Sequence, residues 1–137
     1  SGLHIDSYKC IKYIDGYEIV ISKSNKDNLN SPKTEDLKLW FVNLGGYNPK
    51  KMYEEHEFKL VVAKKAIEAK RKARKNWESN LENKHNDDYS GINYLDQVDD
   101  LYPIKIKNWE INLIPDPEKR NEKLIPDWYG YMRIDKF

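Results

Sequence analysis

The sequence predicts an α+β domain, in which an antiparallel or mixed sheet has one main helix packed on one face. Short apolar or alternating segments bounded by Gly, Pro and Asn are typical of strands. Only residues 64–78 instead show small and aromatic residues at helical spacing. An internal repeat further indicates that about one and a half copies of a duplicated unit build the domain.

The repeat is a set of residue types that occurs twice in the same order. Its first block begins at His4 and recurs from His85, and its second begins at Asp15 and recurs from Asp100. The first set is His4, Asp6, Tyr8, Ile11, Tyr13, Asp15, Tyr17, Ile19 and Ile21, and the second is His85, Asp87, Tyr89, Ile92, Tyr94, Asp100, Tyr102, Ile104 and Ile106.

The repeat divides the chain into four predicted parts. Residues 1–21 are a hairpin that forms the closing half of a first repeat, and residues 22–37 are a linker. Residues 38–114 are a full second repeat of strand, strand, helix and hairpin, and residues 115–137 are a C-terminal extension. Because the first repeat lacks its opening half, we expect an uncovered sheet edge and a homo-oligomer that covers it.

The first elements are predicted from turn residues and apolar runs. Asp15-Gly16 lies between strand-forming residues and is typical of a hairpin turn within residues 3–21. Ser22–Asp36 is polar and is expected to be a solvated linker. The consecutive apolar residues of Lys38–Leu44 predict a strand buried on both faces, and Gly45-Gly46 predicts a turn after it.

The later elements follow from alternation and helical spacing. Glu57–Ala63 alternates as a strand does, and Lys64–Glu78 is predicted to be a helix. Tyr102–Trp109 is predicted to be an edge strand, because Pro103 lacks a backbone donor, and Glu110–Ile114 extends it. The helix is expected to face the sheet with the stripe Ala66, Ala69, Ala73 and Trp77. Proline-bounded residues 115–126 predict a surface loop, and residues 127–134 a short final strand.

Composition excludes several classes of protein. Lys and Arg number 24 against 23 Asp and Glu, which argues against a polyelectrolyte partner for the chain as a whole. The single cysteine, Cys10, excludes an internal disulfide framework and fits a reducing compartment. No apolar run has the length of a membrane span, and no signal peptide is recognised in the sequence as given.

Several ordered motifs resemble one known family. They are LWFVNLGG at 39–46, EEHE at 54–57, HNDDY at 85–89 and DLY at 100–102, with a first copy of the closing segment over residues 2–17. They resemble the bacterial family called domain of unknown function 1543, over residues 2–21 and about 38–106. The resemblance implies a duplicated small domain in a soluble cytoplasmic protein, and it implies no established activity, cofactor or catalytic residue.

The expected function is that of a binding or self-associating module without catalysis and without a cofactor. The enzyme alternative is a small metal-assisted or acid–base hydrolase that uses His56, His85 and Asp87, with Tyr89 as a further candidate. His85, Asp87 and Tyr89 would share one face of a strand, where the carboxylate could orient the imidazole. A repeated His-Asp-Tyr group is more often a hydrogen-bonded network that stabilises a fold, and this interpretation is favoured.

A second alternative is nucleic-acid binding through the basic helix 64–78. Lys70, Arg71, Arg74 and Lys75 are the candidate phosphate contacts, and nearby aromatic residues could stack on bases. Lys and Arg are also good helix formers on a solvated outer face, which is the favoured interpretation.

Overall fold

The computed structural model describes residues 2–24, 36–79 and 97–135, with only the backbone described for residues 75–79 and 97. This part of the chain contains eight strands and one helix. They are β1 (His4–Tyr8), β2 (Tyr13–Ile14), β3 (Tyr17–Lys23), β4 (Lys38–Tyr47), β5 (Glu54–Ala63), α1 (Ala66–Ser79), β6 (Gln97–Pro103), β7 (Trp109–Pro115) and β8 (Trp128–Arg133).

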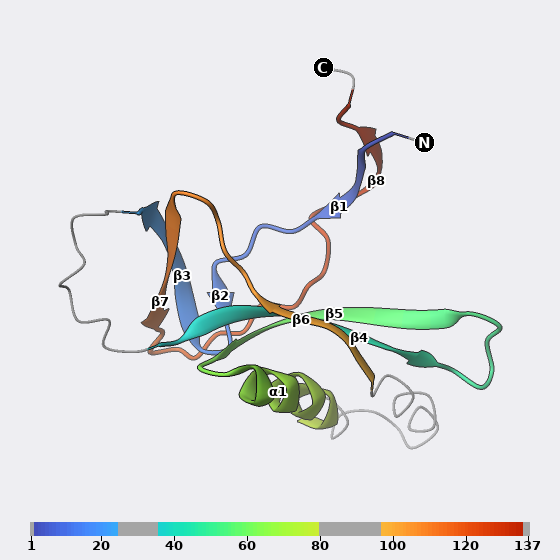
Figure 1. The fold of residues 1–137 in the computed structure, drawn as a ribbon, viewed down its shortest axis with the longest axis horizontal. Coiled ribbons are helices and arrows are strands. Elements are labelled where there is room, and N and C mark those ends of the chain that lie inside the picture. Colours follow the sequence, from blue (N-terminus) through green and yellow to red (C-terminus); the bar gives the residue numbers. More distant parts are fainter. Residues whose placement is uncertain (1, 25–35, 80–96, 136–137) are drawn as a thin grey trace.

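The strands form a central sheet β5-β4-β6, a smaller sheet β2-β3-β7 and a two-stranded ribbon β1-β8 (Figure 1). Every pairing among these strands is antiparallel. The predicted α+β class with one helix on a sheet is therefore confirmed, with the sheets wholly antiparallel in the described residues. The helix of this part of the chain is neither long nor apolar enough to cross a membrane.

The helix covers one face of the central sheet (Figure 1). Val42, Leu44 and Val61 are fully buried on that face, and each contributes roughly 1.5–3 kcal/mol relative to exposure. Ala69 and Ala73 are also fully buried, because small side chains let the helix lie close to the strands. Ala66, which the predicted stripe included, is exposed at the first residue of the helix.

The smaller sheet covers only one end of the opposite face. Ile14, Leu39 and Val62 are buried there, where β2, β4 and β5 meet. Partly buried residues that complete this second cluster are Ile11, Tyr17, Ile19, Leu37, Leu60, Ile104, Ile111 and Leu113. Beyond this end, Phe58 and Tyr102 are 55% and 51% exposed, so no described element covers that part of the face, which is called the open face below.

The predicted turn at Asp15-Gly16 is confirmed. Both residues have positive φ, 54° and 83°, as the tight turn between β2 and β3 requires. β1, however, does not join this hairpin and pairs with β8 instead, so only the short β2 remains on the N-terminal side of the turn.

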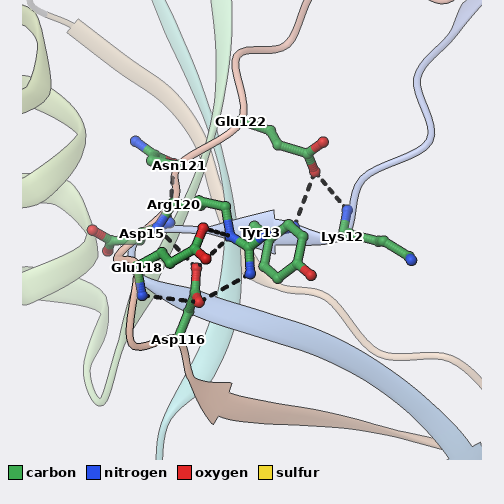
Figure 2. A network of polar contacts seen from close by, with 8 residues as sticks. All are labelled: Lys12, Tyr13, Asp15, Asp116, Glu118, Arg120, Asn121 and Glu122. Atoms are coloured by element: carbon green, nitrogen blue, oxygen red, sulfur yellow. Dashed lines mark hydrogen bonds and ion pairs between the residues drawn. The ribbon is translucent and has the colours of Figure 1, made fainter.

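The loop after β7 is held firmly against that hairpin (Figure 2). Arg120 donates through Nε and Nη2 to the Asp116 carboxylate at 2.9 and 3.2 Å, and its guanidinium lies 3.7 Å from the ring centre of Tyr13. A single carboxylate oxygen of Glu122 accepts from the backbone N–H groups of Lys12 and Tyr13. The predicted surface loop is thus an ordered strap over β2.

Two predicted elements are wrong. Gly45-Gly46 is not a turn, because β4 continues through both glycines to Tyr47 and pairs with β5 up to Glu54. Tyr102–Trp109 is not one strand. β6 ends at Pro103, and the chain reverses through Asn108, which has a φ of 68°, before β7 begins.

The duplication is not confirmed. Asp15 lies in a turn, whereas its counterpart Asp100 lies within β6 opposite Asn43. The first block of the second copy, which includes His85, Asp87 and Tyr89, lies outside the described residues. The division of the chain into repeats remains a prediction.

Candidate ligand-binding site

The open part of the central sheet carries a row of aromatic side chains. Phe41 in β4 lies between Phe58 in β5 and Tyr102 in β6, with ring centres 5.5 and 5.1 Å apart. Side chains of a strand alternate between faces, so Phe41 shares a face with Leu39 and opposes the buried Val42. Three neighbouring strands therefore place three aromatic rings against one another on the side away from α1, with interplanar angles of 36° and 28°.

A polar network adjoins these rings toward the far end of the sheet. Asn43 Nδ2 donates to Asp100 Oδ2 at 2.9 Å, so its Oδ1 faces His56. His56 Nδ1 lies 3.2 Å from Asn43 Oδ1 and 3.2 Å from Asp99 Oδ2. Both oxygens are acceptors, so Nδ1 carries the hydrogen and donates it.

A β-bulge brings two consecutive carboxylates to this network. Asn43 pairs with Asp100 and Leu44 pairs with Val98, which leaves Asp99 as the extra residue of β6. On a regular strand Asp99 and Asp100 would point to opposite faces. The bulge re-aims Asp99, and both carboxylates reach the same cluster.

Gly45 makes room for the contact between Asp99 and His56. A Cβ at this position would overlap Asp99 Oδ2 and would lie 3.0 Å from His56 Nδ1. Gly45 pairs with His56 on β5 and with Gln97 on β6, so it lies directly beneath the contact. Gly45 suggests a turn in the sequence, but in the structure it lies within a strand and leaves space for the Asp99 and His56 side chains to meet.

The cluster carries more negative than positive charge. Glu54 Oε2 lies 3.7 Å from His56 Nε2, which gives the imidazole a carboxylate on each side. Within the described residues, no Lys or Arg forms an ion pair with Glu54, Asp99 or Asp100. Atoms of Glu54, His56 and Asp99 that could bind a metal all lie within 4.8 Å of one another. The arrangement therefore favours a cation.

Of the predicted site residues, the structure places only His56 in this cluster. His85, Asp87 and Tyr89 lie outside the described residues, so their convergence with His56 stays a prediction. Sequence reasoning missed Asn43, Asp99 and Asp100, together with the three aromatic residues. The available signal was a lone Asn in an apolar strand and a pair of Asp residues at a strand start.

The basic helix contributes little to this face. Lys70, Arg71 and Arg74 are exposed on α1, and the side chain of Lys75 lies outside the described part. Lys72 is half-buried and donates to Val62 O at 2.6 Å and to Asp15 Oδ2 at 3.0 Å. Nucleic-acid binding by this helix stays a prediction.

Comparisons with known proteins agree with this fold. The family model described as Domain of Unknown Function (DUF1543) matches residues 51–102, which confirms the resemblance expected from the motifs. The matched range includes His56, Phe58, Asp99, Asp100 and Tyr102. The chain is similar in fold to protein Il1583 from Idiomarina loihiensis, known from a crystal structure, with 24% identity and a TM-score of 0.61 over 99% of this chain and 68% of that chain. Among curated proteins, no match is found.

Proposed function

We propose that this protein is a binding module whose ligand lies on the open face of the central sheet. The observation that carries the proposal is the row Phe58, Phe41 and Tyr102, whose two outer members are about half exposed and whose middle member is half-buried between them. Exposed aromatic surface rimmed by polar groups is typical of interaction sites. The Asn43–His56–Asp99 network supplies directed hydrogen bonds at its edge.

The proposal is tested by nuclear magnetic resonance titration of the full chain. The probes are a blocked tripeptide, a disaccharide, a mononucleotide and Zn²⁺, and we expect at least one to shift resonances of residues 41–45, 54–58 and 98–102. Phe58→Ala should weaken that response, whereas Ile67→Ala, at an exposed aliphatic residue of α1, should not. Shifts that lie elsewhere for every probe, or no shifts, would overturn the proposal.

Self-association is the second role that we infer. The β1-β8 ribbon pairs with no other described strand, and an isolated two-stranded ribbon is marginal in water. Tyr129 and Tyr131 on β8 are 81% and 62% exposed, and a second copy would cover them. Sedimentation equilibrium should give a dimer that Tyr129→Lys dissociates and Ile67→Lys does not, whereas a strict monomer at high concentration contradicts this role.

A metal-dependent activity is a further candidate, supported by the donor set of Glu54, His56 and Asp99. Imidazole and carboxylate ligands suit Zn²⁺ and similar ions. While Nδ1 donates to Asp99, that carboxylate orients the ring, and His56 Nε2 and Glu54 are the two groups that could bind the metal directly, a common arrangement around zinc-bound histidines.

A further inference from the structure

We infer that the ligand of the open face is an arginine side chain presented by a polypeptide partner. This inference rests on the proposed function and specifies the chemistry of the same site. It follows from three properties of the face: its charge, its row of aromatic rings and its exposure.

The charge of the face selects a cation. Glu54, Asp99 and Asp100 lie beside a single imidazole, and no Lys or Arg among the described residues forms an ion pair with them. Phosphate-bearing ligands would be repelled by these carboxylates, which disfavours nucleic acid at this face. The ligand is therefore expected to be positive at the end of the face near His56.

The aromatic row selects a planar cation. A planar guanidinium stacks on an aromatic ring and donates two parallel hydrogen bonds to a carboxylate. An ammonium is a compact point charge without that planar geometry. The chain already holds one of its own arginines in this way. Arg120 lies 3.7 Å from the ring centre of Tyr13 while it donates twice to Asp116 (Figure 2). The open face offers the same two components, with Tyr102 two residues from Asp100 on β6.

The exposure of the face selects a polypeptide over a small free molecule. Phe58 and Tyr102 are each about half exposed, and they flank Phe41 at the two ends of the aromatic row. Small ligands generally need a concave site that buries most of their surface. A polypeptide can lie along a flat face and insert one arginine beside the carboxylates.

The test compares three blocked tripeptides, Gly-Arg-Gly, Gly-Lys-Gly and Gly-citrulline-Gly, by nuclear magnetic resonance titration of the full chain. Citrulline keeps the shape of arginine and removes its charge. We expect the arginine peptide to shift resonances of Phe41, His56 and Tyr102, and the citrulline peptide to bind about tenfold more weakly, because a charge-assisted hydrogen bond is lost. The lysine peptide should lie between them.

Asp100→Asn should weaken the binding of the arginine peptide about tenfold, since the substitution removes a charge with little change of shape. Glu110→Gln, at an exposed carboxylate on β7, should leave the affinity unchanged. Equal binding of arginine and citrulline peptides at this face would overturn the inference and leave the proposed function intact. If only the disaccharide, the mononucleotide or Zn²⁺ binds at this face, the inference is likewise overturned and the proposed function is left intact. If no probe of either series shifts this face, both proposals fail.

Discussion

Lys72 of α1 donates to the carboxylate of Asp15 in the β2-β3 turn, with 3.0 Å between Nζ and Oδ2. Asp15 Oδ2 also accepts from the backbone N–H of Val62, and Lys72 donates to Val62 O. The helix, the central sheet and the smaller sheet therefore meet at one hydrogen-bonded point. These bonds join the elements that pack against the two apolar clusters.

Removing this junction should destabilise the fold. Lys72→Met is expected to lower the free energy of unfolding by about 1 kcal/mol, because it removes hydrogen bonds from two partly buried acceptors. Lys70→Met, on the exposed side of the same helix, is the control and should change it by less than about 0.5 kcal/mol. Urea denaturation of both variants measures the difference, and equal effects would contradict the role of Lys72.

Gly45→Ala should disrupt the cluster at His56. The new methyl group would overlap the Asp99 carboxylate, which is the end of an exposed side chain and must move away from His56, and the expected loss of stability is about 1 kcal/mol or less. Combining Gly45→Ala with Asp99→Ala removes the overlap, so the double variant should be more stable than the sum of single effects predicts. Additive effects in thermal unfolding would show that Asp99 does not occupy the space above Gly45.

The strap over β2 should make the fold sensitive to acid. The Arg120 guanidinium lowers the pKa of Asp116 to about 2, and hydrogen bonds from the Cys10 backbone N–H and from Lys9 lower the pKa of Asp127. The pKa of Glu122 is lowered by the backbone N–H groups of Tyr13 and Lys12. These folded values lie below the ordinary ones, so their stabilisation is present above about pH 4 and is lost as the pH falls toward 2.

Asp116→Asn tests this acid sensitivity. The variant should be less stable than the parent at pH 7, and the difference should shrink below pH 4, where the parent loses the same charge. Glu110→Gln is the control and should keep the parental pH profile. Thermal unfolding monitored by circular dichroism between pH 2.5 and 7 measures both, and a constant difference across that range would refute the expected linkage.

We expect a divalent metal ion to bind at the cluster of Glu54, His56 and Asp99 through the imidazole of His56. Co²⁺ titrated into the full chain should give visible absorption bands that His56→Gln abolishes. His4→Gln is a matched control, because His4 is also exposed and its Nε2 lies 3.1 Å from Asp6 Oδ1. Among the described residues, His4 forms no ion pair with a second carboxylate. Retention of the bands in His56→Gln would exclude this site.

The sequence predicts the elements that depend on local pattern. The apolar run of β4, the alternation of β5, the helix and the Asp15-Gly16 turn follow from residue type and spacing alone. Partners distant in the sequence do not follow from such patterns. β1 pairs with β8 instead of joining the adjacent hairpin, because nothing in a five-residue strand encodes which edge it meets.

The candidate site was only partly predictable for a related reason. His56 stands out because histidine is rare in this chain, which has three. Asp99 and Asp100 become neighbours on one face only through a bulge, and a bulge has no signal in alternating patterns. Gly45 likewise suggests a turn until its neighbours on β5 and β6 are known.

The pairing of strands also orders the folding reaction. β4, β5 and α1 are contiguous in residues 38–79 and need only one short reversal, whereas Tyr17 of β3 must find Pro115 of β7. Contacts between distant residues form late and slowly, because the entropy cost of closing a long loop comes before the contacts that stabilise it. The part of the open face on β4 and β5 is therefore expected to form first, and Asp99, Asp100 and Tyr102 should complete it when β6 docks. Until then Phe41 would lie on a strand whose β6 edge is unpaired, where a chaperone or another nascent chain could bind.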